Sequence, residues 1–286
     1  MKQQWLTIYQ DLKEKGSESS PRGLKIKELE DYIFTGDPYN RFANFEERKL
    51  NVKYIVGEFC WYLRGDLNDI EGISYYSKFW KNIVNENPPF LNSNYGHYIF
   101  QLKQFEHCYN ILLQDKDSRQ ATIILADRKN NLEKTKDKIC TYSINFRIRN
   151  NKLNMSVNMR SNDFILGTQI DYFQFSVIQE MLLKKLQSKY ENLEMGKYTH
   201  KADSLHIYEN KFDLMDKILN NNGENFYPIE FPKIKNAAEV DYILENLANI
   251  EYKIRTKNIS DLELNSLYLY LEEQQFYFTL RCIDTL

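Results

Sequence analysis

The sequence predicts an α/β (α+β) fold, because stretches with the apolar spacing of helices alternate with stretches that alternate like β-strands. No internal repeat and no long linker divides them. The chain has 286 residues, of which 42% are hydrophobic and 27% charged, and this is enough to bury one substantial core. We therefore expect one domain over residues 1–286.

Composition and charge argue against several classes of protein. The net charge is −2 with basic and acidic residues interspersed, so no nucleic-acid partner is expected. The cysteines form no CxxC pair, which argues against a metal site or a disulfide framework and favours a reducing, cytoplasmic location. They are Cys60, Cys108, Cys140 and Cys282. The sequence has neither an export signal nor an apolar run of about eighteen residues, so we expect no membrane contact.

The first third of the chain shows two helical stripes. Apolar residues at helical spacing predict a short helix over 5–12. The segment "GSESSPRG" that follows is rich in turn-forming residues, so it predicts a loop carrying Arg22. A second, broader stripe over 52–63 has Glu58 inside it. An acid in so apolar a neighbourhood requires an explanation.

The segment "CTYSINFRIRNNKLNMSVNMR" predicts a β-hairpin. Apolar residues alternate over 142–148 and again over 153–159, and "RNNK" between them supplies turn chemistry. Period two places Arg160 on the face opposite the apolar row, together with Asn154, Ser156 and Asn158. Cys140 stands at the start of the hairpin, an even number of residues before the first apolar row, so it is expected on the same face as that row.

The stretch "MRSNDFILGTQIDYFQFS" joins the end of this hairpin to a helix. Apolar residues after Gly167 recur at helical spacing as far as Leu186, with Asp171 placed as a possible N-cap. The stretch therefore spans a strand end, a loop and a helix start. Junctions of this kind are where ligand-binding groups usually project.

Seven segments carry a resemblance to a known family. In chain order they are "SPRG", "GEFCWYLRGD", "NSNYG", "DSRQA", "CTYSINFRIR", "MRSNDFILG" and "SLHIYEN". Together they resemble the thymidylate synthase family, and within it the phage-type deoxycytidylate hydroxymethylases, over roughly residues 5 to 210. The resemblance implies a mixed β-sheet packed with helices. Residues 211–286 give no secure match.

The resemblance implies roles for a thiol and an acid. Cys140 matches the nucleophile that adds to ring carbon 6 of the pyrimidine, and Arg160 nearby can help lower the pKa of the thiol. Glu58 matches the acid that organises water and relays protons, and its apolar setting should raise its pKa. Taken alone, Cys140 reads as a buried structural cysteine and Glu58 as a snorkelling or paired carboxylate.

The resemblance implies that three arginines and a serine bind the phosphate: Arg22, Arg119, Arg160 and Ser161. The residue matching Arg119 reaches into the partner subunit's site, so a homodimer is implied. This chain departs from the family by having Gln120 where a second adjacent arginine is common. Each arginine alone would be read as a solvated surface charge.

Sugar, cofactor and ring contacts are implied by the same matches. His206 and Tyr208 match the pair that contacts the sugar 3′-hydroxyl, and otherwise read as part of a strand. Trp80 and Asp163 match positions near the cofactor 5,10-methylenetetrahydrofolate. Tyr95 matches a tyrosine beside the nucleophile, although core packing is the alternative for so common a residue.

Asp171 stands where thymidylate synthases carry asparagine. An amide can donate to uracil O4 and accept from N3–H, whereas cytosine presents an amine and an unprotonated N3. A carboxyl group suits the cytosine pattern, so Asp171 indicates a cytidine monophosphate as substrate. The alternative is a helix-capping aspartate with no role in binding.

The fate of the one-carbon unit rests on two departures from the synthases. Thr141 replaces the histidine that follows the nucleophile, and the C-terminus "RCIDTL" lacks their pattern. Both favour hydration to a hydroxymethyl product. A methylase or hydroxymethylase acting on dUMP or UMP, and a non-enzymatic nucleotide-binding homologue, are the alternatives, and ribose and deoxyribose stay undistinguished.

Overall fold

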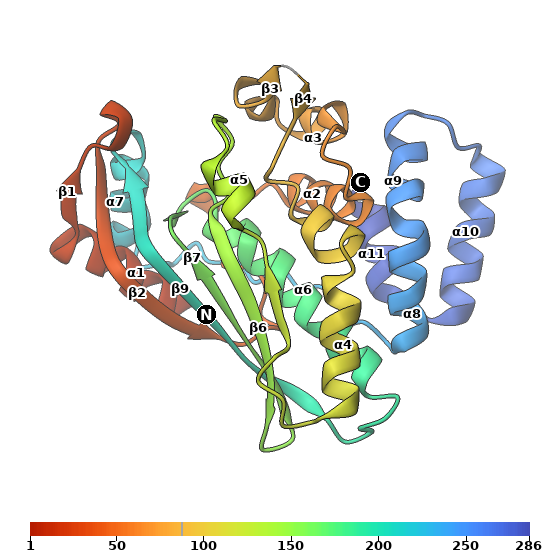
Figure 1. Cartoon of the computed structure of the whole chain (residues 1–286). Helices are drawn as coiled ribbons and strands as arrows, with labels where there is room; N and C mark the ends of the chain where they lie inside the picture. The colour runs from red at the N-terminus through yellow and green to blue at the C-terminus, as the bar shows by residue number, and fades with distance from the viewer. Residues whose placement is uncertain (87) are drawn as a thin grey trace.

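The structure, a computed structural model, describes residues 1–86 and 88–286, and its centre is a seven-stranded sheet (Figure 1). The strands run in the order β1-β2-β9-β7-β6-β5, and β8 also pairs with β9. Their bounds are β1 Ser17–Ser19, β2 Ile26–Gly36, β5 Thr122–Ile124, β6 Thr141–Arg149, β7 Lys152–Met159, β8 Asn162–Asp163 and β9 Glu194–Tyr208. Because β9 is parallel to β7 and β8 but antiparallel to β2, the sheet is mixed, and the predicted α/β fold is confirmed. Two short strands, β3 Asn85–Glu86 and β4 Pro89–Phe90, pair separately.

The hairpin of β6 and β7 confirms the strand prediction over most of its length. Asn150 and Asn151 both have positive φ, 50° and 58°, as a two-residue turn between twisted strands requires. The register shifts between Thr141 and Ser143, so Thr141 is fully buried and Tyr142 is 41% exposed. The expectation that Tyr142 faces the core was therefore wrong, because a bulge adds one residue there and reverses the alternation of faces.

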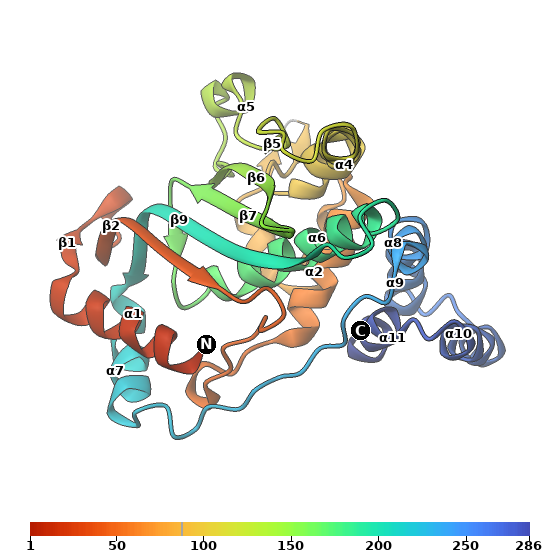
Figure 2. The ribbon, with the colours of Figure 1, turned by 90° about the horizontal axis from the view of Figure 1, so that it is seen from below.

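The helices pack mainly on one face of this sheet. Both α6 and α2 lie on that face, with the last four helices beyond them (Figure 2). The bounds are α1 Lys2–Lys15, α2 Val52–Arg64, α3 Ile70–Tyr76, α4 Gln104–Gln114, α5 Arg128–Leu132, α6 Thr168–Leu186, α7 Phe212–Asn220, α8 Ala237–Tyr242, α9 Ala248–Arg255, α10 Asp261–Gln274 and α11 Tyr277–Thr285. Since α6 lies between the sheet and the other helices, nearly all its residues are buried, polar ones included.

The start of α6 differs from the sequence prediction. Gly167 is the N-cap and Thr168 is the first helical residue, so the backbone N–H of Asp171 already donates to the Gly167 carbonyl, at 3.0 Å. Asp163 closes the preceding turn, because its Oδ1 accepts the N–H groups of Ile165 and Leu166 at 2.9 and 3.0 Å. The prediction of Asp171 as N-cap was therefore wrong. Its carboxyl group lies inside the first helical turn.

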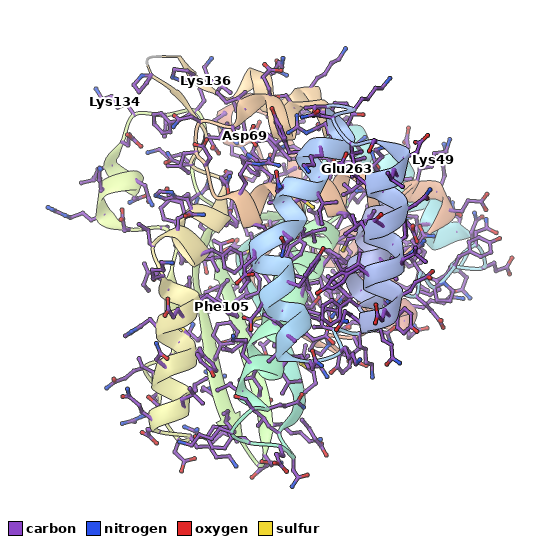
Figure 3. The ribbon with its side chains drawn as sticks, turned by 90° about the vertical axis from the view of Figure 1, so that its right-hand side faces the viewer. Lys49, Asp69, Phe105, Lys134, Lys136 and Glu263 are labelled. Carbon is purple, nitrogen blue, oxygen red and sulfur yellow. The ribbon has the colours of Figure 1, made fainter. Side chains whose placement is uncertain are left out.

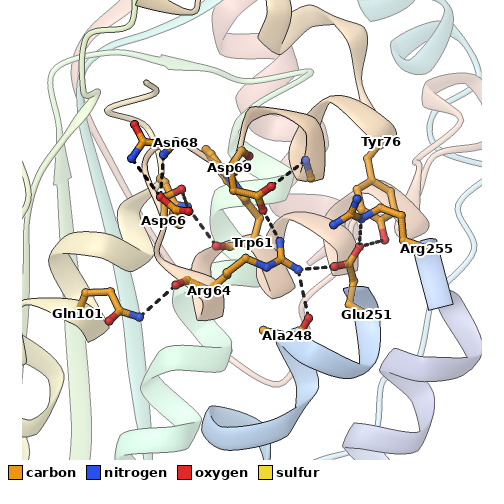
Figure 4. A network of polar contacts seen from close by, with 12 residues as sticks. Trp61, Arg64, Asp66, Asn68, Asp69, Tyr76, Gln101, Ala248, Glu251 and Arg255 are labelled. Carbon is orange, nitrogen blue, oxygen red and sulfur yellow. Dashed lines mark hydrogen bonds and ion pairs between the residues drawn. The ribbon is translucent and has the colours of Figure 1, made fainter. Parts of the chain in front are cut away.

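An ion-pair network joins α9 to α2 and α3 (Figure 4). Arg64 at the end of α2 pairs with Asp69 and with Glu251 of α9, and its Nη2 also donates to the Ala248 carbonyl at 3.1 Å. Glu251 accepts in addition from Tyr76 at 2.8 Å. Because Glu251 is 1% exposed, this contact fixes α9 against the fold.

Helix α10 lies beside α9 on the outer side of the molecule (Figure 3). It shares few residues with the core, since among its residues only Leu271 is buried. Nowhere in residues 1–86 and 88–286 is there a helix that combines the length and the apolar character needed to cross a membrane.

Candidate active site

Cys140 lies at the entrance of β6 and is only partly buried. Arg160, at the end of β7, places its Nη2 3.4 Å from the Cys140 sulfur. The same guanidinium is held by two carbonyls of the approaching chain, Ile139 at 2.9 Å and Lys138 at 3.0 Å. The arginine is therefore fixed beside the thiol by the backbone that leads to it.

The charge state of the thiol reflects two opposing effects. Burial raises the pKa of Cys140, while the guanidinium groups of Arg160 and Arg22 lower it. The expected influence of Arg160 is present, but burial outweighs it. Arg22 lies on an exposed turn with a φ of 56°, and such a strained backbone conformation is typical of ligand-binding positions.

Tyr95 contacts Cys140 directly. Its hydroxyl accepts the backbone N–H of Cys140 at 3.2 Å, and it is 4% exposed. The ring stacks on Phe175 of α6 with centroids 6.2 Å apart. These contacts connect the cysteine-bearing loop to α6.

Glu58 is buried in the middle of α2, as the apolar stripe around it implied. Both carboxyl oxygens accept hydrogen bonds, Oε1 from the Tyr54 hydroxyl at 2.7 Å and Oε2 from Gln174 of α6 at 3.1 Å. Burial raises the pKa of Glu58 to about 8, and the negative charge of Asp171 adds to this. The side chain can therefore exchange a proton near neutral pH. Trp80 reaches the same cluster, because its indole donates to Tyr54 at 3.1 Å.

Asp171 is the second acid of the cluster. Its Oδ2 accepts from the Asn162 amide at 2.7 Å, and the Thr168 hydroxyl donates to the other end of that amide. Burial raises the pKa of Asp171 to about 7, against the effect of the Asn162 hydrogen bond. Its charge also raises the pKa of Cys140, which indicates that acid and thiol share one site.

The remaining matched residues lie where β8 meets β9. Asp163 and His206 are register partners, and the charge of His206 lowers the pKa of Asp163 against the larger effect of burial. The rings of His206 and Tyr208 meet edge to face with centroids 5.0 Å apart. Ser161 lies half-buried between β7 and β8. Arg160 follows Met159, which pairs with Ala202 of the same strand β9.

Arg119 is not brought into this cluster. The segment carrying it follows α4 and meets the opposite end of β6, where Ala121 accepts from Phe146 at 2.8 Å and Asp117 accepts from Arg149 at 3.0 Å. At about 3.4 Å per residue along β6, Arg119 lies roughly 20–30 Å from Cys140 of its own chain. It is exposed there.

Three residues of the cluster escaped the sequence analysis: Tyr54, Asn162 and Gln174. Tyr54 lies one helical turn before Glu58, and this i, i+4 spacing predicts that the two side chains are neighbours on the helix. Asn162 is the third residue of "RSND", and Gln174 is a polar residue in an apolar helix. The packing of α6 against α2 brings Gln174 to Glu58, and the turn before α6 brings Asn162 to Asp171. Among residues 1–86 and 88–286, no group of three or more His, Cys, Asp or Glu side chains is placed to hold a metal ion.

A thiol beside a guanidinium, with two buried acids that titrate near neutral pH, defines a site for nucleophilic and proton-transfer chemistry. The thymidylate synthase family model matches residues 3–261. The chain therefore belongs to the thymidylate synthase family, a family of one-carbon transferases. The match extends well past residue 210, where the resemblance in the motifs ended.

Individual relatives agree with this assignment. The chain is 30% identical to the deoxycytidylate 5-hydroxymethyltransferase of Enterobacteria phage T4, over 72% of this chain and 85% of that protein. It is 29% identical to the deoxyuridylate hydroxymethyltransferase of Bacillus phage SP01, over 83% of this chain but only 65% of that protein. A thymidylate synthase of Mycoplasma mobile is 23% identical over 88% of this chain.

Proposed function

We propose that this chain is a folate-dependent hydroxymethyltransferase that converts a cytidine monophosphate, dCMP or CMP, to its 5-hydroxymethyl derivative. Family membership supports modification of a pyrimidine nucleotide at ring carbon 5. The choice of base rests on one observation, the carboxyl group of Asp171 held by Asn162.

In the orientation assigned to the Asn162 amide, its nitrogen donates to Asp171 Oδ2 at 2.7 Å and its oxygen accepts from the Thr168 hydroxyl. In the neutral acid Oδ2 is then the carbonyl oxygen, and the proton belongs on Oδ1. Such a group donates to cytosine N3 through Oδ1 and accepts from the exocyclic amine through Oδ2. Uracil presents an oxygen instead of that amine, and two acceptors then face each other.

The chemistry assigns one task to each neighbouring group. The Cys140 thiolate forms a bond to ring carbon 6, and Arg160 stabilises its charge. Glu58 holds water and exchanges protons as the adduct forms and decays. Methylenetetrahydrofolate supplies the one-carbon unit when bound, and water completes the hydroxymethyl group. Phe79, which is 58% exposed and packs edge to face on the buried Trp80, offers an aromatic surface for a folate ring.

Phosphate binding and assembly form the second part of the proposal. Arg22, Arg160 and Ser161 bind the nucleotide phosphate from one chain, while His206 and Tyr208 hold the sugar. Arg119 of the partner subunit completes the phosphate site, since Arg119 lies at the far end of β6 from its own Cys140. The protein therefore works as a homodimer. All four cysteines are free thiols, which supports the expected reducing cytoplasm.

A uridylate hydroxymethylase is the second candidate. The relative from Bacillus phage SP01, 29% identical, is a deoxyuridylate hydroxymethyltransferase. For that substrate Asp171 would have to be ionised, so that it accepts from uracil N3–H while tolerating O4 nearby. The two candidates differ in the base that is turned over.

The test is a direct comparison of CMP, dCMP, UMP and dUMP, each with methylenetetrahydrofolate, with products identified by mass. A 5-hydroxymethyl product from a cytidine nucleotide is expected. Turnover confined to uridine nucleotides, or a methyl product, would overturn the proposal.

A further inference from the structure

With Glu58 ionised, the hydrogen bonds of Tyr54 have only one consistent direction. Its hydroxyl lies 3.1 Å from the Trp80 indole nitrogen and 2.7 Å from Glu58 Oε1. An indole N–H can only donate, so the Tyr54 oxygen must accept from Trp80. The single phenolic proton is therefore directed at Glu58.

The second donor to Glu58 is fixed in the same way. Gln174 Nε2 lies 2.9 Å from the Ile55 carbonyl and 3.1 Å from Glu58 Oε2. Both partners are acceptors, so the amide nitrogen must face them. Each oxygen of Glu58 thus receives a donor whose orientation is set by a third group. Donors of this kind favour the carboxylate over the neutral acid.

We propose that Tyr54 is a positioning residue that fixes the Glu58 carboxylate, sets the pH at which it takes up a proton, and ties it to Trp80. The inference deepens the proposed function, since it rests on Glu58 as the proton-exchanging acid. Tyr54 is well placed for this role because its backbone N–H donates to the Asn51 side chain at 3.0 Å, at the N-cap of α2. Its side chain is only partly buried, so it borders the site.

The surroundings of Glu58 determine what the loss of this hydroxyl does. The titratable groups facing Glu58 are Tyr54 and Tyr62 from α2 and Asp171 from α6, while the 3₁₀ helix Lys78–Asn82 brings only the neutral indole of Trp80. Burial and the charge of Asp171 raise the pKa of Glu58, and the Tyr54 hydrogen bond lowers it. Without the Tyr54 hydroxyl, burial and repulsion by Asp171 should raise the pKa of Glu58 further.

The first experiment titrates Glu58 without substrate. Its side-chain carboxyl carbon is followed by ¹³C nuclear magnetic resonance in wild type and in Tyr54→Phe, with Glu58→Gln used to assign the signal. We expect Tyr54→Phe to raise the midpoint by about one pH unit. Tyr98→Phe is the matched control, because the Tyr98 hydroxyl donates to Asn92 instead, at 3.2 Å. An unchanged midpoint in Tyr54→Phe overturns the inference.

The second experiment is a double-mutant cycle on kcat, measured across pH with the preferred nucleotide. Tyr54→Phe is expected to lower kcat about tenfold and to move its pH profile upward, but to have no further effect when Glu58 is already glutamine. Equal losses in both backgrounds would refute action through Glu58. Failure to turn over any nucleotide would refute the proposed function alone, because the titration needs no substrate.

Discussion

The side-chain nitrogen of Asn162 lies 2.7 Å from Oδ2 of Asp171, and this contact holds the carboxyl group in the first turn of α6. Because the hydrogen bond favours the carboxylate, Asn162→Ala should raise the pKa of Asp171 above its present value of about 7. We expect kcat/KM for the cytidine nucleotide to fall about tenfold, as suits the loss of one hydrogen bond to a charged group.

The pH dependence of kcat/KM distinguishes a specific effect of Asn162 on Asp171 from general damage to the protein. If Asp171 recognises cytosine as proposed, its proton donates to N3, so kcat/KM for the cytidine nucleotide should decline as pH rises through about 7. In Asn162→Ala this decline should move to higher pH. Asn246→Ala is the control, since Asn246 donates only within its own helical segment, to the Tyr242 carbonyl at 3.2 Å. An unshifted decline would show that Asn162 does not act on Asp171.

Cys140→Ala tests the covalent step. The variant should lose roughly a thousandfold or more in kcat because the bond to ring carbon 6 cannot form, while nucleotide binding persists. With a 5-fluorinated cytidine nucleotide and methylenetetrahydrofolate, mass spectrometry should detect an adduct on wild type and none on the variant. Cys108→Ala, which removes a buried thiol of α4, should keep the adduct. Activity near the wild-type level in Cys140→Ala would contradict the mechanism.

Glu58 should leave a signature in stability as well as in rate. Its pKa is about 8 in the folded chain against an ordinary 4.5, so the folded state binds a proton that the unfolded chain has already lost between these pH values. The free energy of unfolding therefore falls as pH rises through that window, by up to about 1.4 kcal/mol per pH unit.

Glu58→Gln removes this contribution. Urea unfolding at pH 5 and pH 9 should show a larger loss of stability for wild type than for the variant. The variant should also lose far more in kcat than in nucleotide affinity. Equal losses of stability in the two proteins would mean that Glu58 does not hold a proton in the folded state.

Much of this arrangement was readable from the sequence because its signals are local. The helical stripe around Glu58 predicted a buried acid in α2, and "RNNK" predicted the turn of the hairpin. Tyr142 was misplaced because a bulge leaves no periodic signal, and only the register of β6 against β7 reveals it.

The contacts between helices were not readable in the same way. The apolar spacing of α6 continues through Asp171 without marking where the helix begins, and the turn held by Asp163 places that start at Thr168. The pairing of Asn162 with Asp171 depends on how this turn folds back on the helix. A one-dimensional pattern does not contain that information.

The assembly can be tested by mixing inactive subunits. Arg119→Ala should weaken phosphate binding in the partner subunit's site, whereas Cys140→Ala inactivates the site of its own chain. Random reassociation of equal amounts places both defects in one site of each mixed dimer and leaves the other intact, so about a quarter of wild-type activity should return. No recovery after verified exchange of subunits would contradict a site shared between chains.

Asp171→Asn tests the substrate assignment most directly. The exchange keeps the size of the side chain and replaces the carboxyl group with an amide, so the hydrogen-bonding pattern toward the base changes. The loss of the Asp171 charge also affects Cys140 and Glu58, but this affects both substrates and cancels in their ratio. The measurement is the ratio of kcat/KM for cytidine and uridine monophosphates of the preferred sugar, in wild type and variant. We predict that the ratio falls by roughly one to two orders of magnitude, the consequence of a buried polar mismatch of about 1–3 kcal/mol. An unchanged ratio would contradict cytosine recognition by Asp171.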